Sequence, residues 1–178
     1  KTLDTYTSAG EGDSEAIESY LSNLEYTFRV LKKEALPSTT NENDLFIKPG
    51  TSYQIVKNGV ATGRTGVVET DGTFTIKAGE TAVFTNIAEN SGAYYVQEIV
   101  KAEYEEQFGD VTVSVKPDGG TSYGEEAGVT LDEEEFVGMI SGDLSSENTG
   151  YVNFTNKVDI TELSVLEITK AAVAGSQF

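Results

Sequence analysis

Apolar and polar residues alternate along most of this chain in short runs, and an alternation of period two predicts β-strands. In the run EYTFRVLKK, the apolar residues Tyr26, Phe28 and Val30 fall on one face of such a strand. Turn residues, with Gly and Asn prominent among them, separate the runs. The segments expected to be strands are residues 1–6, 25–33, 51–59, 72–79, 80–88, 91–104, 110–117, 136–140 and 151–158.

Two short Gly-containing sequences predict tight turns. Asn58-Gly59 ends one of the alternating runs, and this dipeptide is typical of a two-residue turn. Ala78-Gly79 lies where the run 72–79 meets the run 80–88. We therefore expect these two runs to form a hairpin.

One segment, SAGEGDSEAIESYLSNL, has the periodicity of a helix. Its apolar residues share one helical face: Ile17, Tyr20, Leu21 and Leu24. Asp13 can cap the start of this helix, and acidic residues suit its first turns. We expect a short helix at the surface of the protein.

About seven well-formed strands joined by short turns predict an all-β fold, a β-sandwich or a related open barrel. We expect one domain over residues 1–160, with a helical insertion at 7–23 and an acidic, Gly-rich insertion at 118–150. The segment 161–178 begins a new alternating run after this domain. It is either the start of a following module or a strand donated to the sheet edge of another subunit.

The charge and composition of the chain exclude several classes of function. The chain has 178 residues, with 12 Lys and Arg against 30 Asp and Glu, a net charge of −18, and no His, Cys or Trp. Without His and Cys it can build no His-dependent catalytic triad, no disulfide and no zinc site of the usual ligands. So acidic a chain repels nucleic acid and anionic lipid, and its longest apolar runs are far shorter than a bilayer span. We therefore expect neither a nucleic-acid-binding protein nor a membrane protein.

No cofactor and no metal ion are expected. Carboxylates cluster in DEEE at 132–135 and in DLSSEN at 143–148, and carboxylate oxygens are suitable ligands for calcium. Neither cluster has the regular spacing of a calcium-binding loop, so we interpret both as solvated acidic surface.

One combination of residues suggests a reaction of the fold with itself. Glu98 lies within the apolar run YYVQEIV, Asn156 lies in the last regular strand, and Lys1, Lys32 and Lys33 lie in the first two strands. Burial disfavours the charged forms of a Lys amine and of a carboxyl group. A neutral amine can then attack the side-chain carbonyl of an Asn, while a protonated Glu polarises that carbonyl and relays protons as ammonia leaves. The product is an intramolecular isopeptide bond formed once per molecule, so we do not expect an enzyme with turnover.

Each of these residues also has a simpler interpretation. A Glu within a strand more often faces solvent, and an Asn near the end of a strand more often lies in a turn. Lys32 and Lys33 fit an exposed strand end, and Lys1 fits a plain terminus. The residue types alone leave both interpretations open.

Two runs of the sequence resemble modules of Gram-positive pilins and adhesins. GTFTIKAGETAVFTNIAENSGAYYVQEI is similar to their pattern G-x-F-x-L-x-x-G, followed by F-x-N-(L/I)-x-x-G-x-x-Y-x-V-x-E, and VNFTNKV is similar to their final strand. The resemblance is to Cna B-type domains and, more closely, to major pilins of the streptococcal T-antigen type. It covers roughly residues 24–33, 72–104 and 151–175, about half of the chain. It implies an Ig-like or prealbumin-like β-sandwich of the Cna B type.

The resemblance also implies roles for three residues. The Glu of the family's E-box corresponds to Glu98, and the Asn that forms the bond corresponds to Asn156. KTLD followed by YTFRVL reproduces the order of the family's opening strands, which implies that Lys1 is the nucleophile. VLEITKAAVAG repeats that opening pattern, so Lys170 is the nucleophile expected in a following module.

The chain departs from the family pattern in its two insertions and in having no residue before Lys1. The alternative nucleophiles are therefore Lys32, Lys33, or Lys170 of a neighbouring subunit.

The function implied is that of a structural module of an extracellular fibre, a pilus shaft or an adhesin stalk attached to the cell wall. Its expected partners are other modules or subunits, arranged head to tail. Two alternatives remain open. One is a non-covalent filament subunit that donates residues 161–178 as a strand to the next subunit. The other is an adhesin domain that binds a host surface ligand through the insertion 118–150.

Overall fold

The computed structural model describes residues 2–6, 14–32, 41–85, 87, 94–99, 108–116, 135–140 and 150–159. Within these ranges the chain is mostly β-strand, with one α-helix, α1 (Ser14–Asn23), and one 3-10 helix, η1 (Glu42–Asp44). The strands are β1 (Thr2–Tyr6), β2 (Tyr26–Lys32), β3 (Ser52–Lys57), β4 (Val60–Val67), β5 (Thr73–Ile76), β6 (Glu80–Val83), β7 (Tyr94–Ile99), β8 (Phe108–Lys116), β9 (Glu135–Ile140) and β10 (Tyr151–Asp159). No helix in these ranges is long and apolar enough to cross a membrane.

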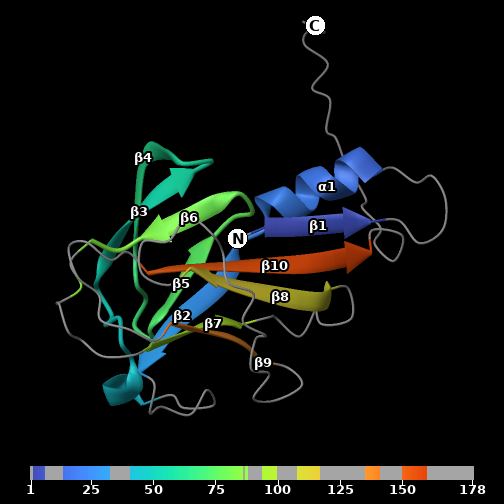
Figure 1. Cartoon of the computed structure of the whole chain (residues 1–178). Coiled ribbons are helices and arrows are strands. Elements are labelled where there is room, and N and C mark those ends of the chain that lie inside the picture. Colours follow the sequence, from blue (N-terminus) through green and yellow to red (C-terminus); the bar gives the residue numbers. More distant parts are fainter. Residues whose placement is uncertain are drawn as a thin grey trace, which may run out of the picture.

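The strands form three sheets (Figure 1). The first has the order β1-β10-β8, with β1 parallel and β8 antiparallel to the central strand β10. The second has the order β5-β2-β7-β9, and the third has the order β4-β3-β6, with every pair antiparallel. This arrangement is compatible with the all-β sandwich that the alternating pattern predicted.

Aromatic rings from all three sheets meet in one hydrophobic core. The ring of Phe28 on β2 lies 5.8 Å from that of Phe74 on β5 and 5.4 Å from that of Phe154 on β10, measured between ring centroids. Tyr53 on β3 lies 5.5 Å from Phe74, so the third sheet packs against the same rings. Aromatic contacts at such distances add to the stabilisation from buried apolar area. The core therefore fixes the relative positions of β2, β7 and β10, the strands that carry the candidate residues Lys32, Glu98 and Asn156.

The helix was predicted correctly, except for one residue of its buried face. Ile17 and Leu21 are buried in the core, and Leu24, just after the helix, packs against it. Tyr20 is exposed instead. The proposed cap, Asp13, lies outside the described residues.

The prediction of a hairpin between the runs 72–79 and 80–88 was wrong. β5 pairs with β2, whereas β6 pairs with β3, so the turn at Gly79 carries the chain from one sheet to another. A Gly-containing turn between two alternating runs does not reveal whether the two runs pair with each other. Here both strands turn apolar side chains toward one core from two different sheets.

β4 was not predicted as a strand. Its sequence, VATGRTGV, has no apolar alternation because nearly all of it is exposed. The strand exists because the turn at Asn58 and Gly59, both with positive φ (51° and 77°), folds it back onto β3. Positive φ at both central residues is the property of hairpin turns whose twist matches that of the strands.

Candidate functional site

Glu98 lies on β7 and points into the core. Its neighbour on β2 is Phe28, and its neighbour on β9 is Phe136. Residues directly opposite one another in an antiparallel pair share a face of the sheet, so Glu98 shares the apolar face of Phe28. Only 1% of its surface is exposed, and its predicted burial is therefore confirmed.

Asn156 lies on β10, in the same alternating phase as Phe154 and Val158, which are both buried. Its exposed fraction is 0%. Its strand runs between β1 and β8, where its neighbours in register are Leu3 and Val111. Asn156 thus belongs to the sheet that contains the first strand of the described chain.

Glu98 and Asn156 meet across two sheets. The amide Nδ2 of Asn156 donates a hydrogen bond of 3.1 Å to Oε1 of Glu98. Within the described ranges, Oδ1 of Asn156 is buried and accepts no hydrogen bond. A buried acceptor without a partner is unusual and costs about 1–3 kcal/mol. The Asn carbonyl is thus held in the core beside a carboxyl group, with its oxygen open to a further donor.

Of the candidate lysines Lys1 and Lys32, only Lys32 lies within the described residues. Lys1 lies outside the described residues, but the next residue, Thr2, pairs with Thr155, one residue before Asn156. Lys32 is exposed, and its Nζ donates a 2.6 Å hydrogen bond to the backbone oxygen of Asn43. Its amine is therefore held at the surface by the 3-10 helix.

The remaining candidates fall outside the described residues. These are Lys33, Lys170, the segment 161–178, residues 7–13 of the first insertion, and all of the insertion 118–150 except 135–140 and 150. Within the described part of the chain, no three carboxylate side chains come together as metal ligands.

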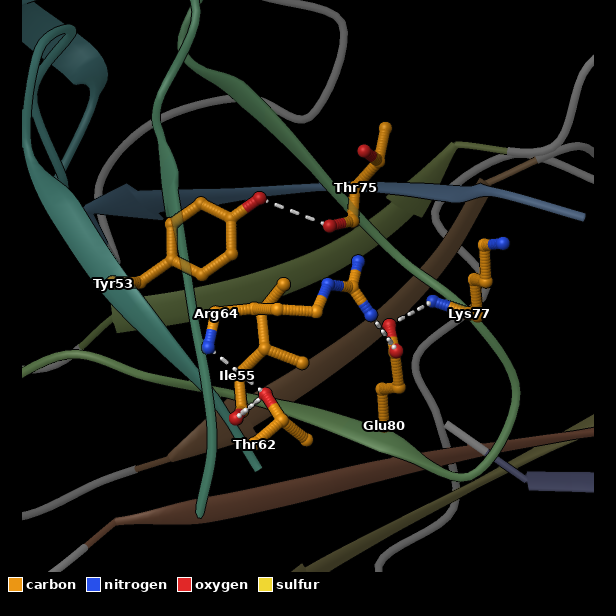
Figure 2. A network of polar contacts seen from close by, with 7 residues as sticks. All are labelled: Tyr53, Ile55, Thr62, Arg64, Thr75, Lys77 and Glu80. Atoms are coloured by element: carbon orange, nitrogen blue, oxygen red, sulfur yellow. Dashed lines mark hydrogen bonds and ion pairs between the residues drawn. The ribbon is translucent and has the colours of Figure 1, made fainter. Parts of the chain in front are cut away.

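A second buried carboxylate, Glu80, was not singled out from the sequence (Figure 2). Its Oε1 accepts a 2.6 Å hydrogen bond from Nη1 of Arg64, and its Oε2 accepts the backbone N–H of Lys77 at 3.0 Å. Burial alone would raise the pKa of Glu80, but the hydrogen bonds from Lys77 and Arg64 hold this pKa below its ordinary value. Glu80 therefore joins β4 to the turn before β6, which is a structural role. The only signal in the sequence was a Glu placed directly after a Gly turn.

Comparisons of the chain with protein-family models, with curated proteins and with solved structures each found no match.

Proposed function

We propose that this chain is a structural module of an extracellular fibre, a pilus shaft or an adhesin stalk of a Gram-positive cell. In this proposal the fold is an Ig-like or prealbumin-like sandwich of the Cna B type. An isopeptide bond between Lys1 and Asn156, promoted by Glu98, ties its first strand to its last. The observation that carries the proposal is the buried contact between Glu98 and Asn156 across two sheets.

The reaction conserves atoms without any external reagent. The neutral amine of Lys1 attacks Cγ of Asn156, and the bond from Cγ to Nδ2 breaks as the new bond from Cγ to Nζ remains. One proton moves from the attacking amine to the departing amide nitrogen, which leaves as ammonia. Glu98 is placed to carry this proton, because its Oε1 already accepts a hydrogen bond from Nδ2. Proton transfer by a positioned side chain typically accelerates a reaction by about 10²–10⁴-fold.

Rotation of the Asn156 amide about its Cβ–Cγ bond exchanges Nδ2 and Oδ1. In that orientation a protonated Glu98 donates to the carbonyl oxygen and polarises it for attack. Oδ1 accepts no hydrogen bond within the described residues, so the rotation costs this oxygen no hydrogen bond there. The hydrogen bond from Nδ2 to Glu98 is exchanged for the new one. One carboxyl group can therefore serve both the attack and the departure of ammonia.

The choice of Lys1 rests on the register of β1. Thr2 pairs with Thr155 and Leu3 pairs with Asn156, in a parallel ladder. The Cα atom of Lys1 lies within about 3.8 Å of that of Thr2, because a peptide bond joins the two residues. Lys1 precedes Leu3, the register partner of Asn156, by two residues, which is about 6.6 Å along a strand. The strand spacing adds about 4.8 Å across, so an extended Lys side chain is needed to reach the Asn156 amide. Lys32, with its amine held at the surface, is less favourably placed.

The proposal is tested by the intact mass of the purified chain beside that of a Glu98→Ala variant. We expect the wild-type chain to lack the mass of one ammonia and the variant to have its full sequence mass. Asn156→Ala should likewise show no loss, because it removes the carbonyl that is attacked.

The matched control is Glu80→Ala, which removes the other buried carboxylate of the described chain. This variant should keep the loss of ammonia, since Glu80 lies in a separate network. Circular dichroism of each variant checks that it has folded. A wild-type chain at full sequence mass would contradict the cross-link, and a Glu98→Ala variant that still loses ammonia would contradict the role of Glu98.

A further inference from the structure

In two places within the described residues, an Asn or Asp is followed directly by glycine. Asn58-Gly59 forms the tip of the hairpin made by β3 and β4, and Asp71-Gly72 lies between β4 and β5. At such a pair the backbone nitrogen of the glycine can attack the side-chain carbonyl of the residue before it. Glycine favours this attack, because it has no side chain to hinder its nitrogen and its backbone is unusually free to move. The fold restrains the two pairs very differently.

At Asn58-Gly59 the reacting groups are accessible and unrestrained. Both residues are exposed, and Figure 1 shows their hairpin at the periphery of the molecule. Within the described residues, neither the side chain of Asn58 nor the backbone N–H of Gly59 makes a hydrogen bond. Nothing lies within 4 Å of the place that a Cβ of Gly59 would occupy. The attacking nitrogen, the attacked carbonyl and water can therefore meet there.

Asp71 and Gly72 belong to a turn that hydrogen bonds hold closed. The backbone N–H of Gly72, which would have to attack, donates to the backbone oxygen of Glu69 at 3.0 Å. Oδ1 of Asp71 accepts the backbone N–H of Thr73 at 3.0 Å and the hydroxyl of Thr73 at 2.7 Å. Gly72 is also buried, and a Cβ at this position would collide with the side chain of Leu45. Attack at this pair therefore requires the turn to open.

We propose that Asn58 is a site of spontaneous deamidation and isomerisation in the folded protein, and that the turn at Asp71 is protected. The nitrogen of Gly59 forms a bond to Cγ of Asn58 as the bond from Cγ to Nδ2 breaks. The proton of the attacking N–H leaves with Nδ2 as ammonia, and a cyclic imide remains. Water then opens the ring at either carbonyl carbon. Opening at Cγ gives aspartate, and opening at the main-chain carbonyl gives isoaspartate.

Closure of the ring requires the hairpin tip to move. The pairing of Lys57 with Val60 holds the backbone on both sides of the turn. The movement disturbs little else, because all four residues from Lys57 to Val60 are exposed. Local openings at exposed positions need far less free energy than global unfolding. The reaction can therefore proceed while the rest of the protein stays folded.

Both products change the hairpin. Each replaces a neutral amide by a carboxylate next to Lys57. Isoaspartate also adds one carbon atom to the main chain of a two-residue turn, and the length of such a turn fixes the register of the strands that it joins. We therefore expect isoaspartate at position 58 to loosen the pairing of β3 with β4 as the protein ages.

The inference does not depend on the proposed cross-link, because Lys1, Glu98 and Asn156 take no part in it. Both reactions release ammonia, and the cyclic imide has the same mass deficit as a cross-linked chain. The hydrolysed products have taken up water and stay linear, so a peptide map separates the two reactions. Deamidation at Asn58 should also continue unchanged in the Glu98→Ala variant.

The test places two Asn-Gly pairs of equal chemistry in one chain, the Asp71→Asn variant. Asn keeps the side-chain oxygen that accepts the hydrogen bonds from Thr73, and circular dichroism checks the fold. The variant is incubated at mildly alkaline pH with and without urea, and peptide mapping follows each pair. In the folded chain, position 58 should react at least about tenfold faster than position 71, whose hydrogen bonds must first break. In urea the two positions should react at similar rates.

The wild-type chain provides the same comparison if the variant fails to fold. Isoaspartate should form at Asn58 in the folded chain, whereas at Asp71 it should form only in urea. The proposal is overturned if Asn58 stays intact in the folded wild-type chain over a time in which urea-unfolded chain is converted. It is also overturned if positions 58 and 71 of the folded variant react equally fast.

Discussion

Glu80 and Glu98 show how the partner of a buried carboxyl group decides what that group can do. Both are almost fully hidden from solvent. Glu80 accepts hydrogen bonds from the guanidinium of Arg64 and from a backbone N–H, and these hold it in its charged form. Glu98 accepts its hydrogen bond from the side-chain amide of Asn156, which is a group that can react. The first arrangement stabilises the fold, and in the proposed reaction the second carries a proton.

Removal of the Arg64 guanidinium should destabilise the protein in a pH-dependent way. We expect Arg64→Ala to lower the free energy of unfolding by about 1–2 kcal/mol at pH 7, because it leaves a buried carboxylate without one of its donors. The pKa of Glu80 is lowered in the folded state from its ordinary value of 4.5. Its contribution is therefore complete above pH 4.5 and is lost as the pH falls through the lower, folded-state pKa.

Urea unfolding of Arg64→Ala and of the wild-type chain at neutral and at acidic pH measures this effect. The difference between the two should shrink at the acidic pH, where Glu80 is protonated. Lys32→Ala, which removes an exposed cation, should change the free energy of unfolding little at either pH. A difference for Arg64→Ala that is independent of pH would contradict the role given to Glu80.

Glu98 and Asn156 could be proposed from the sequence because each lies in an apolar run that also resembles the pilin and adhesin modules. Glu98 is in phase with Tyr94, and Asn156 is in phase with Phe154. A polar residue at such a position is visible without a structure. The partnership of Arg64 with Glu80 could not be predicted in this way, since Arg64 lies in a segment without alternation.

β2, β3 and β10 were predicted within two residues of their observed bounds, because burial of one face imposes the alternation on the sequence, whereas β6 ends at Val83 although the run 80–88 was expected to be a strand. β4 buries almost nothing, so its sequence carries no such pattern. The pairing of β5 and β6 with different partners depends on contacts between distant parts of the chain. Such contacts leave no signal in the turn that joins the two strands.

Substitution by Ala should destabilise the protein at two glycines of the hairpin formed by β3 and β4, for a different reason at each. Gly59→Ala should cost about 1–2 kcal/mol, because Gly59 has a φ of 77° and nothing lies near the added methyl group. At Gly66 the added Cβ would collide with the ring of Tyr53. That ring packs in the core, and its hydroxyl donates a 2.9 Å hydrogen bond to the backbone oxygen of Thr75 (Figure 2).

Thermal or urea unfolding of the two variants compares the effects. Gly66→Ala should lower the free energy of unfolding by about 1–3 kcal/mol relative to the wild-type chain, and it should be the more destabilising of the two variants. It should also perturb the near-ultraviolet signal of the aromatic core. Gly59→Ala should leave that signal unchanged. Equal costs with no change in the aromatic signal would contradict the close approach of Gly66 to Tyr53.

The position of the proposed bond decides how the whole molecule would bear a load. β1 and β10 are neighbours in one parallel ladder, so a bond from Lys1 to Asn156 would carry a pulling force directly between them. The intervening chain, with the core and all three sheets, would then carry none of that force. This is a property suited to a fibre, because local opening exposes chain to proteases only when strands can separate.

Single-molecule stretching with handles on both ends of the chain measures this property. The cross-linked wild-type chain should show no unfolding step, whereas the Glu98→Ala variant should lengthen by roughly 500 Å when its domain unfolds. The variant serves as the control for handle attachment. An unfolding step of that length in the wild-type chain would show that Lys1 and Asn156 are not joined.

The most direct measurement is a peptide map of the purified wild-type chain by tandem mass spectrometry. The account predicts one branched peptide in which Nζ of Lys1 is joined to the side chain of Asn156, smaller by one ammonia than the sum of its two parts. A branched peptide at another lysine would reassign the nucleophile. Recovery of Lys1 and Asn156 only in separate, unmodified peptides would contradict the proposed bond.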